Sequence, residues 1–166
     1  MLLCYHCLNL SKPQDQCEHC GADLPARKAP PRIQTKTALL NRWSLEYRTR
    51  DIERPELETR LAEEERTIRT ILGQAADEQF DSESLPMVEE ELRTGRQGLQ
   101  AYLEALAGFR TWLDTVDSGE LKRVLALAAQ ADSLMNDAVA MNFNNYRTYL
   151  ESMGEFLHQA GYQGPQ

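Results

Sequence analysis

All four cysteines lie within the first 20 residues, in two pairs with the same internal spacing. Cys4 and Cys7 form one C-x2-C pair, nine residues follow, and Cys17 and Cys20 form the second. Two residues between thiolates let one tight turn present both sulfurs to an ion, and two such turns complete a tetrahedron. The spacing therefore predicts one bound metal ion, and it favours Zn2+. Iron is the best competing metal, because four thiolates also suit it.

Disulfides and redox-active thiols are the alternatives to metal binding. Disulfides need an oxidising compartment, and the N-terminus has neither the basic nor the apolar segment of an export signal. A redox C-x-x-C normally begins a helix in a strand–helix unit, so two pairs in so short a segment fit metal ligation better. His6 and His19 lie inside the pairs, but four thiolates already fill a tetrahedron. We expect both histidines to hydrogen-bond beside a closed, structural site.

Residues 2–25 resemble the short bacterial zinc ribbons that carry two C-x-x-C knuckles near a terminus. The resemblance rests on the two cysteine pairs and on the run CEHCGADLP over residues 17–25. It implies that the four cysteines hold a structural zinc ion and implies little else, because such ribbons occur in proteins of many functions. The sequence departs from these ribbons at Leu8, where they usually have glycine, as at Gly21.

No set of residues in the chain predicts a catalytic site. A di-metal carboxylate bundle needs two Glu-x-x-His motifs on different helices, and the helical part of the chain has one such spacing, at Glu155 and His158. The consecutive glutamates at 63–65 and 89–91 point to different faces of a helix, so they cannot pair as acid and base. There is no nucleophile–base arrangement and no phosphate-binding glycine loop. We therefore expect a protein that is not an enzyme.

The composition is that of an acidic globular protein. Hydrophobic residues make up 42% of the 166 residues and charged residues 27%, and no apolar stretch reaches the roughly 18 residues of a membrane span. The net charge is −8, while residues 1–32 carry four basic against three acidic side chains. Nucleic-acid binding through the acidic remainder is therefore not expected, and only the ribbon is left open to it. We expect a cytoplasmic protein without a membrane segment.

Proline and turn residues divide the chain into a ribbon, a linker and a helical part. The expected organisation is a zinc ribbon at 1–25, a Pro-rich linker at 26–34, a helical bundle at 35–160 and a frayed tail at 161–166. Helices are predicted at about 35–53, 55–80, 85–116 and 120–159. Pro55 either breaks or kinks its helix, and the apolar register preserved across it favours two nearly collinear segments.

The apolar spacing predicts a mainly α fold, with three or four long helices in an elongated up-down bundle with coiled-coil-like packing. The best heptad pattern runs from Leu85 to Val116, where only Gly95 interrupts apolar residues at steps of three and four. The final helix has an early face that begins at Leu121. Its later predicted face consists of Tyr146, Tyr149, Met153, Phe156 and Leu157.

Two non-enzymatic functions fit these features. In the first, the protein is an adaptor or assembly component that binds protein partners through its helical bundle, with the zinc ribbon as a docking or capping module. A long apolar seam of this kind is also compatible with a homo-oligomer. In the second, it is a regulator whose ribbon acts on a transcription or nucleic-acid-processing machine, as ribbons often do. Salt-sensitive retention on a nucleic-acid column is expected only for the regulator.

Overall fold

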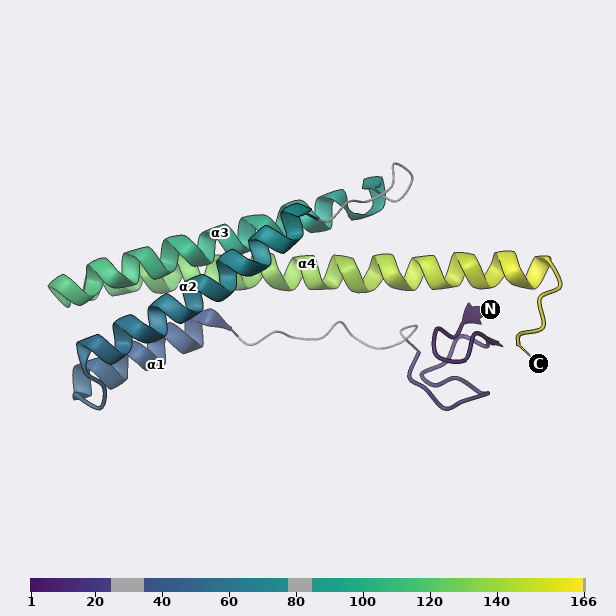
Figure 1. Cartoon of the computed structure of the whole chain (residues 1–166), viewed down its shortest axis with the longest axis horizontal. Coiled ribbons are helices and arrows are strands. Elements are labelled where there is room, and N and C mark those ends of the chain that lie inside the picture. The colour runs from purple at the N-terminus through teal and green to yellow at the C-terminus, as the bar shows by residue number, and fades with distance from the viewer. Residues whose placement is uncertain (25–34, 78–84, 166) are drawn as a thin grey trace. The chain divides into compact units, whose positions relative to one another are not determined.

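The computed structural model describes residues 1–24, 35–77 and 85–165 (Figure 1). Two parts of the prediction lie outside these ranges. They are the whole linker at 26–34 and the last three residues of the helix predicted at 55–80. By its internal contacts the chain divides into two compact units. One comprises the N-terminal residues up to Pro31 together with Val139–Gln166, and the other comprises Arg32–Ala138.

The fold is mainly helical, as predicted. The helices are α1 (Lys36–Thr49), α2 (Arg54–Asp77), α3 (Leu85–Thr115) and α4 (Ser118–Gln159). Two short strands, β1 (Leu2–Leu3) and β2 (Leu10–Ser11), form an antiparallel pair in the cysteine segment. Among the described residues, no helix combines the length and the apolar character needed to cross a membrane.

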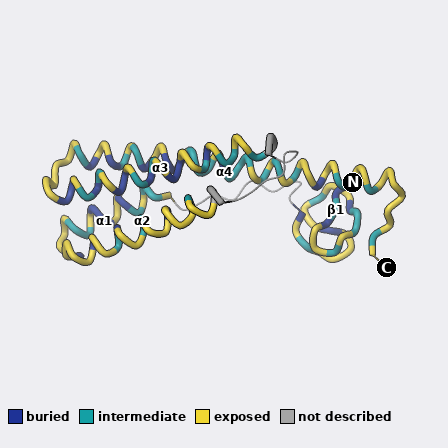
Figure 2. Tube along the Cα trace, turned by 45° about the horizontal axis from the view of Figure 1, so that its top comes forward, coloured by how far each residue is buried: buried dark blue, intermediate teal, exposed yellow. Residues whose placement is uncertain are grey.

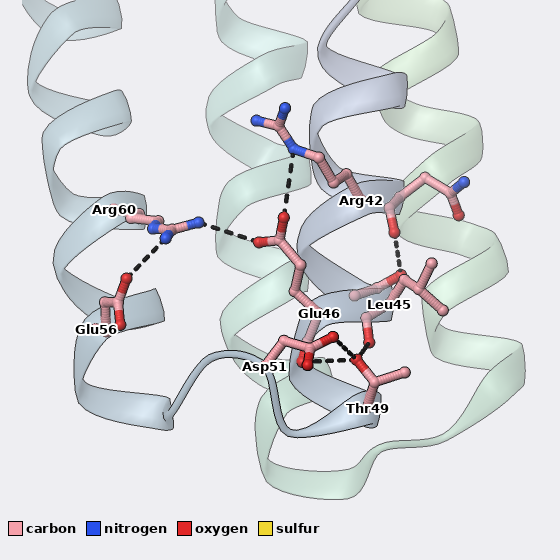
Figure 3. A network of polar contacts seen from close by, with 9 residues as sticks. Arg42, Leu45, Glu46, Thr49, Asp51, Glu56 and Arg60 are labelled. Carbon is pink, nitrogen blue, oxygen red and sulfur yellow. Dashed lines mark hydrogen bonds and ion pairs between the residues drawn. The ribbon is translucent and has the colours of Figure 1, made fainter.

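Helices α1 and α2 form an antiparallel hairpin, so the expectation of two collinear segments was wrong. Helix α1 ends where Arg50 adopts a left-handed conformation (φ 65°) and its amide bonds back to Glu46 and Tyr47. Arg60 of α2 then reaches Glu46 at 3.0 Å while it also pairs with Glu56 on its own helix (Figure 3). The apolar spacing continues across the turn because α1 and α2 each bury an apolar face in the same core. That spacing does not require the two helices to be collinear.

Each helix of the Arg32–Ala138 unit buries one apolar face in a common core, and the exposed residues lie on the opposite faces (Figure 2). Its members include three large aromatic residues, Trp43 of α1 and Phe109 and Trp112 of α3, and the ring centroids of Phe109 and Trp112 lie 4.9 Å apart. Helix α4 contributes small residues at Ala128 and Ala131. The rest of the buried core consists of Leu40, Ile52, Leu57, Leu61, Ile68, Leu99, Tyr102, Ala105, Leu106, Leu113, Leu121 and Val124.

A buried carboxylate joins three helices at one end of this core. Asp132 of α4 is only 6% exposed and accepts hydrogen bonds from the backbone amides of Lys36 and Thr37, at 2.7 and 3.0 Å. These amides belong to the first turn of α1, where helical partners are missing. The hydroxyls of Thr37 and of Tyr102 on α3 also donate to Asp132, while the ammonium of Lys36 pairs with Glu64 of α2. Asp132 therefore acts as a tertiary cap for α1.

Replacement of Tyr102 by phenylalanine should change how stability depends on alkaline pH. Burial and then the hydrogen bond to Asp132 raise the pKa of Tyr102. Its contribution is therefore complete below the pKa of an unfolded tyrosine, about 10, and is lost as the pH rises above that value. Tyr102→Phe should lower the free energy of unfolding by about 1–2 kcal/mol at pH 7, and by progressively less above pH 10. Urea unfolding at pH 7, 10 and 11 measures this difference, and a difference that stays constant would contradict the assignment.

Candidate metal centre

The two cysteine pairs form turns with the same hydrogen-bond pattern. In the first, the amide of Cys4 donates to Asn9 at 2.9 Å and the amide of Leu8 donates to Cys4 at 2.8 Å. In the second, the equivalent bonds run from Cys17 to Ala22 and from Gly21 to Cys17, at 2.8 and 2.9 Å. Each cysteine pair thus sits on one closed turn. The departure at Leu8 does not change this geometry, because Leu8 takes the left-handed conformation (φ 57°) that Gly21 takes in the second turn (φ 72°).

The four sulfurs are arranged to hold one metal ion. All of them lie within 4.8 Å of one another. The Cys4–Cys20 and Cys7–Cys17 sulfur pairs are each 3.7 Å apart. A zinc–sulfur distance of about 2.3 Å gives a regular tetrahedron with edges of about 3.8 Å, so the observed pairs fit an ion of this size. The predicted ligands Cys4, Cys7, Cys17 and Cys20 are therefore brought together at one point.

Local hydrogen bonds favour the thiolate form at part of the cluster. The side-chain amide of Asn9, followed by its backbone amide, lowers the pKa of Cys7 to about 6. The backbone amide of Ala22 acts in the same direction on Cys20, but desolvation and the neighbouring thiols outweigh it and raise the pKa of Cys20. Desolvation also raises the pKa of Cys4. Because metals bind thiolates, metal uptake must release protons from the sulfurs with raised pKa values, and acid must weaken binding.

Neither histidine of the ribbon belongs to the cysteine cluster. The Nε2 atom of His19 lies 3.0 Å from the carbonyl oxygen of Leu10, which fits an imidazole N–H donating to β2. The hydroxyl of Ser11, which is fully buried, accepts from the amide of Glu18 at 3.3 Å. Both contacts join the strand that follows the first turn to the second turn. They hold the two turns face to face, which is what four-fold ligation of one ion requires.

Substitution of Leu8 by glycine should tighten metal binding. A non-glycine residue in the left-handed region costs about 1–2 kcal/mol, and Leu8 is exposed, so little packing is lost. Leu8→Gly should raise metal affinity about fivefold, measured by competition with a coloured chelator. Gly21→Ala is the reciprocal variant. A Cβ at Gly21 meets nothing within 4 Å, so it adds backbone strain alone and should lower affinity by a similar factor. Equal affinities for all three chains would exclude strain at these turns.

The ribbon shares a small hydrophobic core with the C-terminal part of α4. Leu2 and Leu24 of the ribbon and Leu150 of α4 are each at most 2% exposed, and they pack with Cys4 and Cys17. The metal ligands are therefore packed against the side chains that attach the ribbon to the helix. Formation of the metal centre and of this core should stabilise each other.

Gly154 allows the first strand to approach the helix backbone. A Cβ built at Gly154 would lie 2.4 Å from the carbonyl oxygen of Met1 and 2.9 Å from the amide nitrogen of Leu3. These are backbone atoms, which cannot move aside as the end of a flexible side chain can. Any other residue at this position would push the ribbon away from Leu150.

Gly154→Ala should therefore detach the ribbon from α4 even though alanine is the better helix former. We expect fast amide exchange in residues 2–11 and a metal affinity at least about tenfold lower, since the clash is with rigid backbone. The matched control is Gly73→Ala in α2, where a Cβ meets nothing within 4 Å. That change should raise the free energy of unfolding by about 0.5–1 kcal/mol. If both variants simply gain stability, the close contact at Gly154 does not exist.

The prediction of the later apolar face of α4 was wrong for its three aromatic residues. Tyr146, Tyr149 and Phe156 are exposed, with 41%, 48% and 66% of their surface accessible. Leu150, which the prediction left out, is the residue that is buried. The spacing of three and four identified an apolar helix, but exposed aromatic residues, and not the buried Leu150, carried the pattern.

The ribbon and this part of α4 also form a groove of about 510 Å3. Its walls are Tyr5 from the first cysteine turn and Phe143, Tyr146 and Leu150 from α4, with Leu24 and Asp23 from the second turn. This groove was not predicted from the sequence, because its two sides are separated by more than a hundred residues. Tyr5 inside a knuckle, exposed and aromatic, was the one available signal.

Comparisons of the chain with family models, with curated proteins and with solved structures find no match. The assignment of the metal centre therefore rests on the four cysteines and on the geometry of their turns.

Proposed function

We propose that this protein is a non-catalytic adaptor that binds protein partners, with a zinc ion that stabilises the docking surface. The observation that carries the proposal is the distribution of exposed apolar side chains. Among the described residues, seven of the ten large exposed hydrophobic residues belong to the unit of the ribbon and Val139–Gln166, although this unit is the smaller one. They are Met1, Tyr5, Leu8, Tyr146, Tyr149, Phe156 and Tyr162.

Exposed apolar residues gathered in one unit are typical of an interaction surface, whereas single scattered ones are ordinary. In the described part of the helical unit the exposed large hydrophobic residues are Leu45, Ile71 and Val116, which lie on different helices or turns. This contrast favours docking at the ribbon unit, with the helical bundle as its support. Aromatic residues such as Tyr149 and Phe156 are also the types enriched at protein interfaces.

The proposed role of zinc is structural. Four thiolates leave no ligand position for water, which a catalytic zinc needs. Within the described part of the chain, the cysteine cluster is the one group of side chains with the geometry to hold an ion.

Elemental analysis of the purified chain should give one zinc per molecule, and one iron per molecule with visible thiolate absorption would replace zinc in this proposal.

A pull-down from a nuclease-treated lysate of the source organism tests the adaptor function. The full chain should retain a partner, and Tyr149→Ser combined with Phe156→Ser should lose it. Both side chains are more than 45% exposed, so these changes should leave zinc content and helicity unaltered. The matched control combines Leu45→Ser with Ile71→Ser, which removes two exposed apolar residues from the helical unit and should retain the partner. Loss of the partner only in the control would refute the proposal. So would a partner that the full chain retains from an untreated lysate but not from the nuclease-treated one.

A further inference from the structure

The side chain of Asn9 links the first cysteine turn to the segment that follows α4. Its Nδ2 atom donates a hydrogen bond to the backbone carbonyl of Cys7 at 3.2 Å, and the backbone carbonyl of Asn9 accepts from the amide of Cys4 at 2.9 Å. At the other end of the side-chain amide, Oδ1 faces Gly164. A Cβ built at Gly164 would overlap Oδ1 and lie 3.0 Å from Cγ of Asn9. Asn9 therefore contacts a metal-ligand turn at one end of its amide and residue 164 at the other.

Two glycines set the path of the chain from the end of α4 to Asn9. At the cap of α4, the amide of Gly161 donates to the carbonyl of His158 at 3.1 Å, and Gly161 has the left-handed conformation (φ 76°) that such a cap needs. Gly164 is also in the left-handed region, with φ 88°. Glycine adopts these angles without the steric cost that other residues meet. The backbone conformation at these two residues therefore brings the chain against Asn9.

The contact with Gly164 restrains the first cysteine turn. The side chain of Asn9 is short, so Oδ1 can move away from residue 164 only if the amide group rotates. That rotation would also carry Nδ2 away from the carbonyl of Cys7 and break the hydrogen bond between them. The backbone of residue 164 thus limits the rotation of the amide and keeps it bonded to the turn.

We propose that Asn9 is a positioning residue of the metal centre and that the segment after α4 holds it in place. Asn9 bonds to both ends of the turn that carries the first two ligands, through the amide of Cys4 and the carbonyl of Cys7. These bonds fix the direction of both thiolates before the ion binds, as hydrogen-bonded partners behind ligands do in other metal sites. The inference rests on the metal centre of the proposed function and adds a residue that acts through its ligands.

The test measures metal binding by the full chain. Competition with a coloured chelator gives the Zn2+ affinity, and the visible bands of the Co2+-loaded chain report the geometry of the thiolates. Asn9→Ala should lower the Zn2+ affinity about tenfold and shift the Co2+ bands, because the turn loses its bond at the carbonyl of Cys7. Gly164→Ala should have the same two effects, because its Cβ displaces Oδ1 of Asn9. A change in stability alone would leave the bands of the saturated chain unchanged.

Gly161→Ala is the matched control for Gly164→Ala. It adds similar backbone strain in the same segment, but its Cβ meets nothing within 4 Å. It should therefore keep the Co2+ bands of the unmodified chain. The double variant of Asn9→Ala and Gly164→Ala should bind Zn2+ about as tightly as Asn9→Ala alone, because the Cβ at position 164 then has no Oδ1 to displace.

Unchanged Zn2+ affinity and Co2+ bands in Asn9→Ala would overturn the inference. So would an equal loss of affinity from Gly164→Ala in the presence and in the absence of the Asn9 side chain. In both cases the metal centre of the proposed function would remain. A full chain that takes up no metal would instead remove that centre and this inference together.

Discussion

Cys17→Ser should abolish stoichiometric metal binding while most of the helical structure remains. Cys17 is 3% exposed, packs with Leu2 and Leu24 and belongs to the cysteine cluster, so its loss should affect both the candidate metal centre and the ribbon core. Removal of one ligand should lower metal affinity by more than about a hundredfold, since even the loss of an outer-shell partner costs 10–100-fold. Metal content should fall from one ion per chain to a small fraction in elemental analysis, and a strong chelator should reproduce the effect in the unmodified chain.

The matched control is His6→Ser, which introduces the same residue at an exposed position inside a knuckle. It should keep the metal. Circular dichroism of Cys17→Ser should retain the signal of α1, α2, α3 and the first part of α4, because the core of that unit contains no ribbon residue. Global unfolding of Cys17→Ser would show that the two units form one cooperative structure.

Asp132→Ala should strongly destabilise the helical unit. It removes the acceptor for the amides of Lys36 and Thr37, for the Thr37 hydroxyl and for the phenol of Tyr102. The Tyr102 hydroxyl is buried and the other three donors are partly buried, and a buried donor left without an acceptor costs about 1–3 kcal/mol. The four donors together should therefore cost about 3–5 kcal/mol. The free energy of unfolding of an ordinary domain is about 5–15 kcal/mol, so Asp132→Ala should remove a large part of it. Urea unfolding should show this decrease, with faster amide exchange at the start of α1.

Asp137→Ala is the control for Asp132→Ala. It removes the same side chain from the same helix at an exposed position, and should change stability by less than about 0.5 kcal/mol. The stability of Asp132→Asn should lie between the stabilities of Asp132→Ala and Asp137→Ala. The amide keeps one acceptor oxygen, but its NH2 group faces other donors. Equal stability of the Asp132 and Asp137 variants would mean that Asp132 does not cap α1.

The clustering of the four cysteines was predictable because metal ligation requires a local spacing. Cys4 and Cys7 share one turn and Cys17 and Cys20 another, and both turns are fixed by contacts within six residues. The helices were predictable for a similar reason, since their apolar periodicity repeats along each segment. These features depend on residues near one another in the sequence.

The unpredicted features depend on contacts between distant segments. Asp132 follows Ala128 by four residues and precedes Met135 by three, so it occupies a core position of α4, but its partners lie in α1 and α3. Gly154 would be judged a weak point of a helix, because its use depends on the backbone of Met1 and Leu3. A periodicity says which face of a helix is apolar, but not which remote group that face meets.

The attachment of the ribbon to α4 has a consequence for biosynthesis. Leu2 and Leu24 are synthesised long before Leu150, the helix residue with which they form the small core. At roughly 5–20 residues per second, the completed N-terminal knuckles wait about 6–25 s for it. During this interval their apolar side chains and thiols are open to chaperones, oxidants and competing metals. The nascent chain can therefore complete the ribbon only after the part of α4 around Leu150 has emerged.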